Sequence, residues 1–229
     1  MIPPHGGKLV NRILVGRRKQ KALEAIKELP KVEVAWETGK DVENIAKGVF
    51  SPLEGFLNRE EFESVLNNMR LPDDTPWTIP IVLDASREEI KEIKEGDDVI
   101  LAVKGVGAFA LLHVEEIYRY NKREYARKVF KTTDLNHPGV YRVLTGREYL
   151  IGGKIDLFKE LKSKFYMYSL TPLETRVLFK EKGWRTIVGF QTRNVPHLGH
   201  EFVQKTALTL ADGLFINPLI GKKKRGDFK

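Results

Sequence analysis

A short polar segment at residues 189–201, with the sequence GFQTRNVPHLGHE, contains the side chains best suited to chemistry. It follows a run of strand-forming residues and opens a helical pattern, and parallel sheets bind ligands at such strand ends. A helix N-terminus offers unpaired backbone N–H groups and the positive end of the helix dipole, which attract phosphate groups. The segment is therefore predicted to bind an anion such as the phosphate chain of a nucleotide.

Two histidines stand at the predicted start of this helix. His197 and His200 are three residues apart and share a face of the first turn, while Gly199 lets a bulky group approach the backbone. Imidazole N–H groups can donate hydrogen bonds to phosphate oxygens as charge builds on a departing pyrophosphate. We expect this electrostatic role without a nucleophilic side chain, although a single histidine near a helix start is more often structural.

The strand end and the loop that follows it add further donors. The planar guanidinium of Arg193 suits bidentate capture of a tetrahedral oxyanion, and the Gln191 amide adds a donor without charge. Asn194 is expected either to bind phosphate or to cap the helix. Glu201 is interpreted as a first-turn residue that complements the helix dipole, and it is left outside the site.

The elements around this segment indicate an α/β arrangement. Residues 171–183 predict a helix that opens at Thr171, and a buried strand is predicted at 185–191. A helix over 197–213 and a strand at 214–221 complete a β-α-β pattern. Two strands cannot form a parallel sheet covered on both faces, so this tail is expected to be the opening of a larger domain.

The preceding part of the chain predicts a β-rich unit. A G-x-G-x-x-A pattern at Gly105, Gly107 and Ala110 is interpreted as a β-turn, because a strand and not a helix follows it. Glu54 and Gly55 suggest a turn without a catalytic role. Helices are expected at 18–29, after Asn58 and near 121–130, strands at 77–85, 97–103 and 108–118, and turns at Asp134 and 137–140.

Composition excludes several classes of site. None of the 229 residues is cysteine, which excludes disulfides, thiolate nucleophiles and cysteine-ligated metals. There is no Walker-type GKS or GKT, and no carboxylate cluster indicates a metal site held by the protein. Lys and Arg number 39 against 31 Asp and Glu, and the formal charge of +8 favours an anionic partner. No run suits a signal peptide or a membrane span, so a cytoplasmic location is expected.

Several motifs occur together in a recognisable order. They are FSPLEGF at 50–56, Asp134 with HPGV at 137–140, TPLETR at 171–176, GW at 183–184, QTRN at 191–194 and HLGHE at 197–201. The last two resemble the sulfate-binding and HxGH motifs of ATP sulfurylases, within the HxGH nucleotidyltransferase superfamily. The resemblance covers essentially the whole chain.

The resemblance implies an α/β plus β-rich fold. A PUA-like β-barrel domain would span 1–166, and 167–229 would be the incomplete start of a Rossmann-like parallel α/β nucleotidyltransferase domain. The implied reaction transfers the adenylyl group of ATP, with Mg²⁺, to sulfate in sulfate assimilation, which gives adenosine 5'-phosphosulfate and pyrophosphate. The implied partners are ATP and sulfate, with a homo-oligomer for the full-length protein and neither a membrane nor nucleic acid.

The resemblance also implies a role for each site residue. Gln191 and Arg193 would hold sulfate, and Asn194 would contact the phosphate chain near the reacting centre. The implied catalytic residues are Arg193, Asn194, His197 and His200, and the nucleotide-binding residues are Gln191, Thr192, Asn194, His197, Gly199 and His200.

Two departures separate this sequence from the family pattern. Asn217, Lys223 and Arg225 stand where the family usually has His, Thr and Pro, while Lys224 is either a phosphate contact or part of a solvated tail. The later family motifs, including a GRDHAG-like loop, have no counterpart. The chain is therefore expected to be a fragment, and its own activity is left open.

Two other functions stay open. A non-catalytic PUA-like RNA-binding module agrees with the β-rich part and the positive charge, although aromatic and basic residues do not interleave on the predicted strands. Another HxGH nucleotidyltransferase with a different acceptor would share the histidines but would not need QTRN. RNA binding without a response to ATP would favour the first, and pyrophosphate release that is indifferent to sulfate would favour the second.

Overall fold

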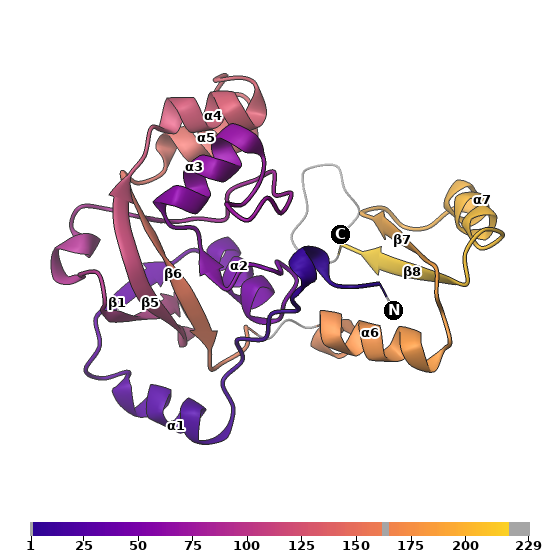
Figure 1. Ribbon diagram of the computed structural model, residues 1–229, viewed down its shortest axis with the longest axis horizontal. Helices are drawn as coiled ribbons and strands as arrows, with labels where there is room; N and C mark the ends of the chain where they lie inside the picture. Colours follow the sequence, from indigo (N-terminus) through magenta and orange to yellow (C-terminus); the bar gives the residue numbers. More distant parts are fainter. Residues whose placement is uncertain (1, 162–164, 220–229) are drawn as a thin grey trace. The chain divides into compact units, whose positions relative to one another are not determined.

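The computed structural model describes residues 2–161 and 165–219, and the chain forms two compact units (Figure 1). Residues 4–162 make up the first, called here the sheet unit. Residues 1–3 and 163–229 make up the second, called the site unit. None of the helices in the described ranges combines the length and the apolar character that a bilayer crossing requires.

A six-stranded sheet is the frame of the sheet unit. Its centre consists of three long antiparallel neighbours, β4 (Asp98–Val103), β5 (Gly107–Arg119) and β6 (Tyr149–Leu157). Successive residues of a strand point to opposite faces of the sheet, so alternate apolar side chains of these three strands pack together in one core. Fully buried members of this core include Val99, Leu101, Phe109, Leu112, Ile151 and Ile155.

Three short strands complete the sheet. β1 (Lys31–Val34) runs parallel to β4, while β2 (Gly55–Phe56) and β3 (Leu83–Ala85) pair antiparallel with β6. The mixed, strand-rich arrangement confirms the β-rich fold predicted for this part of the chain. The helices around it are α1 (Gly16–Ala25), α2 (Trp36–Ala46), α3 (Arg59–Asn68), α4 (Lys122–Phe130) and α5 (Pro138–Thr145), with 3-10 turns η1 (His5–Gly7) and η2 (Glu89–Glu92).

Helices α3, α4 and α5 lie side by side at one end of the sheet unit (Figure 1). Asn58 begins α3 as the sequence predicts: its Oδ1 accepts from the Glu61 N–H at 3.0 Å, and its own N–H donates to Glu61 Oε2 at 3.0 Å. Behind these helices, the Phe62 ring meets Tyr125 edge to face at 5.5 Å, within a second buried cluster. Local capping and aromatic packing together therefore hold this end of the unit.

Three expectations about this unit are corrected by the structure. The strand expected at 77–85 is limited to β3, and Pro80, which has no N–H for a sheet ladder, lies in the segment that is not a strand. The helix expected over 18–29 ends at Ala25. The turn-rich stretch at 137–140 is the start of α5, because His137 caps the helix and Pro138 suits its first position.

The FSPLEGF segment at 50–56 also differs from the expected turn. Gly55 and Phe56 form β2, and the turn comes earlier, at residues 47–52. A Cβ at Gly55 would lie 1.9 Å from the Gly153 carbonyl oxygen, so only glycine allows the two strands to approach this closely. Leu53 and Phe56 are buried on either side of it. The segment therefore contributes sheet packing.

The turn predicted at Gly105 is confirmed between β4 and β5.

A histidine on the surface of the sheet links three strands through hydrogen bonds to two carboxylates. His113 on β5 bonds through Nδ1 to Asp98 at 2.6 Å and through Nε2 to Asp156 at 3.0 Å, and Arg12 pairs with the same Asp156 at 3.0 Å. Burial alone would lower the pKa of His113, but the hydrogen bonds to Asp156 and Asp98 outweigh it and raise the pKa.

This raised pKa predicts a loss of stability on the alkaline side. The contribution of protonated His113 is complete below the ordinary histidine pKa of about 6.5, and it disappears as pH rises through the higher pKa of the folded state. We expect the guanidinium unfolding midpoint to fall between about pH 6 and pH 8.5, and the fall to be smaller in His113→Gln. If the unfolding midpoint fell equally with pH in the wild-type protein and in His113→Gln, the prediction would be contradicted.

The site unit contains a parallel β-α-β element. Strand β7 (Ile187–Thr192) pairs in parallel with β8 (Gly213–Pro218), from Ile187 opposite Gly213 to Thr192 opposite Pro218. Helix α7 (Leu198–Ala207) connects them, and α6 (Pro172–Glu181) precedes β7, after the 3-10 turn η3 (Tyr166–Tyr168). The β-α-β pattern predicted from the sequence is confirmed.

The prediction that β7 is a buried strand is wrong. Of its six residues only Thr192 is buried, and the others are half-buried or exposed. In the described part of the chain β7 has one strand neighbour, β8, so its side chains lack the cover that a wider parallel sheet provides. Helix α6 begins as expected: the Thr171 N–H donates to Glu174 Oε2 at 2.6 Å in a capping box.

Candidate functional site

The residues singled out by their chemistry lie at one edge of the parallel pair. Gln191 and Thr192 end strand β7, Arg193 and Asn194 follow in the loop, and His197 caps helix α7. The pairing of the two strands places Asn217 on β8 opposite Gln191. Asn217, noted in the sequence only as a departure from a family pattern, therefore stands beside the candidate site.

The two histidines are held by the helix that they begin. His197 Nδ1 accepts a hydrogen bond from the Gly199 N–H at 3.1 Å, and His200 Nδ1 accepts one from the His197 N–H at 3.2 Å. Each of these two hydrogen bonds satisfies one backbone N–H group at the start of the helix. This is the structural role expected of a histidine at a helix start, and here both histidines have it.

The same bonds determine which nitrogen can serve a ligand. A ring nitrogen that accepts a hydrogen bond carries no proton, so each neutral imidazole has its proton on Nε2. Nδ1 is occupied by the backbone in both His197 and His200. The two Nε2–H groups are then the donors that an anion at this helix start would meet. Capping and anion binding are therefore compatible in the same side chains.

Ring contacts limit the freedom of the two imidazoles. Their centroids lie 4.0 Å apart with planes at 47°, and Phe190 from β7 meets His200 edge to face at 5.7 Å. Gly199 stands against the His197 ring, where a Cβ would lie 3.0 Å from Cε1. A side chain at this position would press on the ring, so glycine preserves the geometry of the pair.

Thr192 differs from the other candidates because its side chain is buried, with 7% exposure. Its Oγ1 accepts from the Asn194 N–H at 3.1 Å and donates to the Asn194 carbonyl at 3.2 Å, and its own carbonyl accepts from the Leu219 N–H at 2.9 Å. These bonds shape the loop that presents Arg193. The Thr192 hydroxyl is thus engaged within the loop, while Gln191, Arg193 and Asn194 are exposed.

A carboxylate lies near the site, in the first turn of α7, and is paired with a lysine. Glu201, in the first turn of α7, forms an ion pair with Lys205 at 2.5 Å one turn later. It therefore complements the helix, as the sequence indicates, and its charge is partly balanced. Within residues 2–161 and 165–219, no group of three or more His, Cys, Asp or Glu side chains is placed to hold a metal ion. Lys223, Lys224 and Arg225 lie outside the described residues.

Comparison with known proteins divides the chain into two matched parts. The PUA-like domain family matches residues 2–160, and the ATP-sulfurylase family matches residues 166–229. Curated relatives named sulfate adenylyltransferase are 59% identical in Pyrococcus abyssi and 58% identical in Thermococcus onnurineus, each over 99% of this chain. Another, from Staphylothermus marinus, is 56% identical over the whole chain.

These relatives are longer than this chain. The chain spans 59% of the length of the first two and 60% of the third. A solved structure described as a hexameric APS kinase from Thiobacillus denitrificans has the same fold, with a TM-score of 0.76 over 99% of this chain and 41% of its own length. Its sequence identity is 22%, so this likeness concerns the fold alone.

Proposed function

This chain belongs to the ATP-sulfurylase family, with a PUA-like domain ahead of the family's catalytic region, and we propose that it provides the substrate-binding edge of a sulfate adenylyltransferase. In the proposed reaction a sulfate oxygen attacks the α-phosphorus of ATP. The bond between the α-phosphorus and the bridging oxygen breaks, and pyrophosphate leaves. The products are adenosine 5'-phosphosulfate and pyrophosphate.

The observation that carries the proposal is the pair of backbone-capped imidazoles at the start of α7. Their Nε2–H groups are fixed as donors by the bonds at Nδ1, at 3.1 Å and 3.2 Å. Donors already oriented toward developing negative charge need no reorganisation during the reaction, which makes them effective in stabilising a departing pyrophosphate. We assign His197 and His200 to the phosphate chain on this basis.

We assign sulfate to the residues immediately before the helix. Arg193 can hold two oxygens of a tetrahedral anion with its planar fork, and the exposed Gln191 amide can donate to a third. Asn194 is proposed to contact the phosphate chain, and Thr192 to contribute backbone groups. Two anions must be neutralised and aligned before an in-line displacement, and neighbouring donors on one loop favour that alignment.

Magnesium is proposed to arrive with ATP. In the described part of the site, the exposed side chains offer N–H donors and the amide oxygens of Gln191 and Asn194, and the nearby Glu201 carboxylate is paired with Lys205. Such a set fits an ion held chiefly by phosphate oxygens. When bound, Mg²⁺ would neutralise part of the triphosphate charge.

The remaining features of the whole protein are proposals of the same kind. We propose a division at residues 166 and 167, close to residue 166, where the ATP-sulfurylase match begins. The two compact units divide slightly earlier, at residues 162 and 163. We also propose a cytoplasmic location and a homo-oligomer, the second supported only by the description of the solved APS kinase as hexameric.

The test uses this chain and a chimera. In the chimera, the 229 residues are continued by the C-terminal part of the Pyrococcus abyssi relative that this chain does not match. We expect pyrophosphate release from Mg·ATP only when sulfate is present, and only in the chimera. The unaltered relative is the positive control.

Two outcomes would support other functions. Pyrophosphate release that is unchanged by sulfate would indicate another acceptor. RNA binding by the 229-residue chain, without any response to ATP or sulfate, would favour a non-catalytic PUA-like module. An inactive chimera that is folded, beside an active relative, would contradict the proposed function of this chain's residues.

A further inference from the structure

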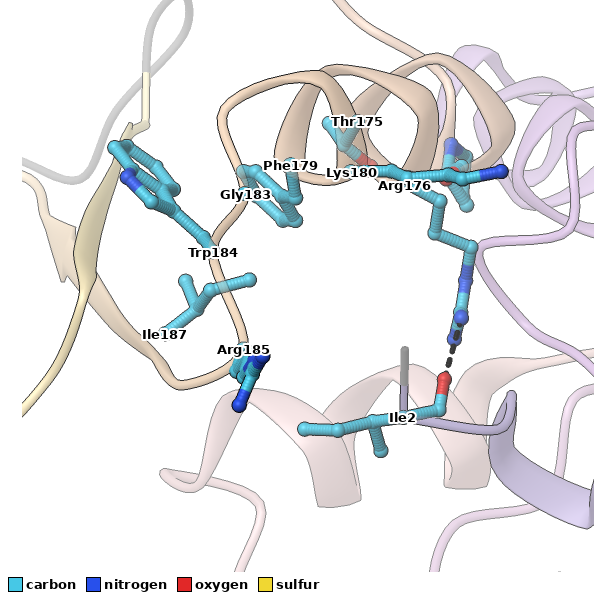
Figure 2. Close-up of a pocket in the computed structure, with 10 residues that line it drawn as sticks. Ile2, Thr175, Arg176, Phe179, Lys180, Gly183, Trp184, Arg185 and Ile187 are labelled. Carbon is cyan, nitrogen blue, oxygen red and sulfur yellow. Dashed lines mark hydrogen bonds between the residues drawn. The ribbon is translucent and has the colours of Figure 1, made fainter.

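A pocket of about 530 Å³ lies in the site unit, apart from residues 191–200 (Figure 2). Its volume is in the range of small-molecule sites, about 300–1,000 Å³. It opens between α6, the turn at 183–185, the first residue of β7 and Ile2. Since a strand rises about 3.3 Å per residue, Ile187 is about 16 Å from Thr192 along β7. The pocket is therefore at the opposite end of the strand from the candidate active site.

An aromatic and aliphatic wall forms one side of the pocket. Phe179 and Trp184 stack with their centroids 5.7 Å apart and an angle of 29° between their planes, and Phe215 meets Phe179 edge to face at 5.6 Å. Trp184 also lies against Gly213, where a Cβ would be 2.1 Å from the indole ring. Figure 2 shows Phe179 and Ile187 facing the open space. This wall is held in place by packing and suits a flat apolar group.

Cationic side chains surround the same space. Arg176, Lys180 and Arg185 all line the pocket, and none of the described residues that line it is acidic. In Figure 2, Arg176 and Arg185 stand on opposite sides of the opening, and Arg176 Nη1 donates to the Ile2 carbonyl at 2.7 Å. An anion that entered would thus meet positive charge from two directions.

Asp212, which bonds to the backbone beside the pocket, is not one of the lining residues. Asp212 Oδ2 accepts from the N–H groups of Arg185 and Thr186, both at 2.8 Å, and from the Thr186 hydroxyl at 3.0 Å. The Asp212 carboxylate thus bonds to backbone N–H groups just before β7. Its negative charge lies near Arg185, but Asp212 does not line the pocket. The lining is thus basic as well as apolar.

We propose that this pocket binds a small aromatic anion, with its planar ring against Phe179 and Ile187 and its anionic group toward Arg185. The aromatic wall and the cationic side chains together indicate this ligand. A purely apolar ligand would not need the cations, and inorganic phosphate would not need the aromatic wall. A nucleoside monophosphate has this combined chemistry, and other aromatic acids share it. The proposal stands apart from the reaction assigned to residues 191–200.

The experiment follows the indole N–H signal of Trp184 in two-dimensional NMR spectra of the 229-residue chain. The other tryptophans, Trp36 and Trp77, belong to the sheet unit, and Trp184→Phe assigns the signal. Three probes separate the ring from the charge: AMP, adenosine and inorganic phosphate. We expect AMP to shift the Trp184 signal, adenosine to bind about tenfold more weakly, and phosphate alone to have no effect up to about 10 mM.

Matched variants locate the binding. Arg185→Gln should weaken the binding of AMP about fivefold to tenfold and leave the binding of adenosine unchanged. The substitution removes the positive charge of an exposed side chain, and adenosine has no anionic group to lose that contact. Lys205→Gln, which removes an exposed cation on α7, should change neither. A Trp184 signal that does not respond to AMP, or responds equally to adenosine, would overturn the proposal. Shifts confined to residues 190–200 would also overturn it, while they would support nucleotide binding at the start of α7.

Discussion

Replacing His197 with asparagine should lower sulfate-dependent pyrophosphate release by the chimera about 100-fold without destabilising helix α7. Asparagine is a favourable N-cap residue, so its side-chain oxygen can replace Nδ1 as the acceptor for the Gly199 N–H. It is too short to provide the donor that Nε2 places farther from the backbone. The substitution therefore separates the two roles of this histidine.

His197→Ala is the matched variant for the first role. Alanine removes both the donor and the cap, and we expect the same loss of turnover together with a decrease of about 1 kcal/mol in the free energy of unfolding. Steady-state rates and guanidinium unfolding on the same proteins measure the two effects. A normal rate in the asparagine variant would show that His197 is only a helix cap.

Replacing Arg193 with alanine should strongly weaken the binding of sulfate. We expect the KM for sulfate in the chimera to rise by about 100-fold or more, since a charge-assisted bidentate contact is lost, while ATP binding changes little. Arg193→Lys restores the charge but not the planar fork, and it should therefore recover only part of the sulfate affinity. Initial rates over a range of sulfate concentrations and ATP binding by calorimetry measure these effects.

Lys205→Gln is the control for this pair of variants. Lys205 is an exposed cation on α7 that pairs with Glu201 and contacts none of the candidate residues in the loop. It should leave the KM for sulfate unchanged. An Arg193→Ala variant that loses ATP affinity as strongly as sulfate affinity would place this arginine on the phosphate chain, contrary to the assignment proposed above.

Elements with strong local signals were predictable from the sequence. Asn58 with Glu61 and Thr171 with Glu174 begin α3 and α6 through bonds between residues three apart, so the pattern contains the whole cause. A different local signal begins α5, where the sequence pattern predicts a turn: His137 Nδ1 accepts from the N–H groups of Gly139 and Val140, and Pro138 occupies the first helical position. A histidine followed by proline is a helix start that sequence reasoning could have found.

Elements defined by distant partners were not predictable in the same way. Strand β2 contains two residues and exists because Gly55 fits against Gly153, almost a hundred positions later. Strand β6 was not predicted, although it pairs with β5, β2 and β3. Glycines at 152 and 153 weaken its local strand signal, while contacts with three neighbours stabilise it.

The sequence by itself determined which residues could bind anions and that they share one strand end and one helix start. Gln191 to His200 are contiguous, and short-range geometry is sufficient to bring them together. The bonds at Nδ1 of His197 and His200 are also local, because they join residues two and three positions apart. Only the tertiary structure decided that Thr192 is buried and that Asn217 lies beside Gln191. It also decided the pocket of Arg176, Phe179 and Arg185. Burial, ring orientation and cavities depend on segments that are separated in the chain, and a local pattern does not record those contacts.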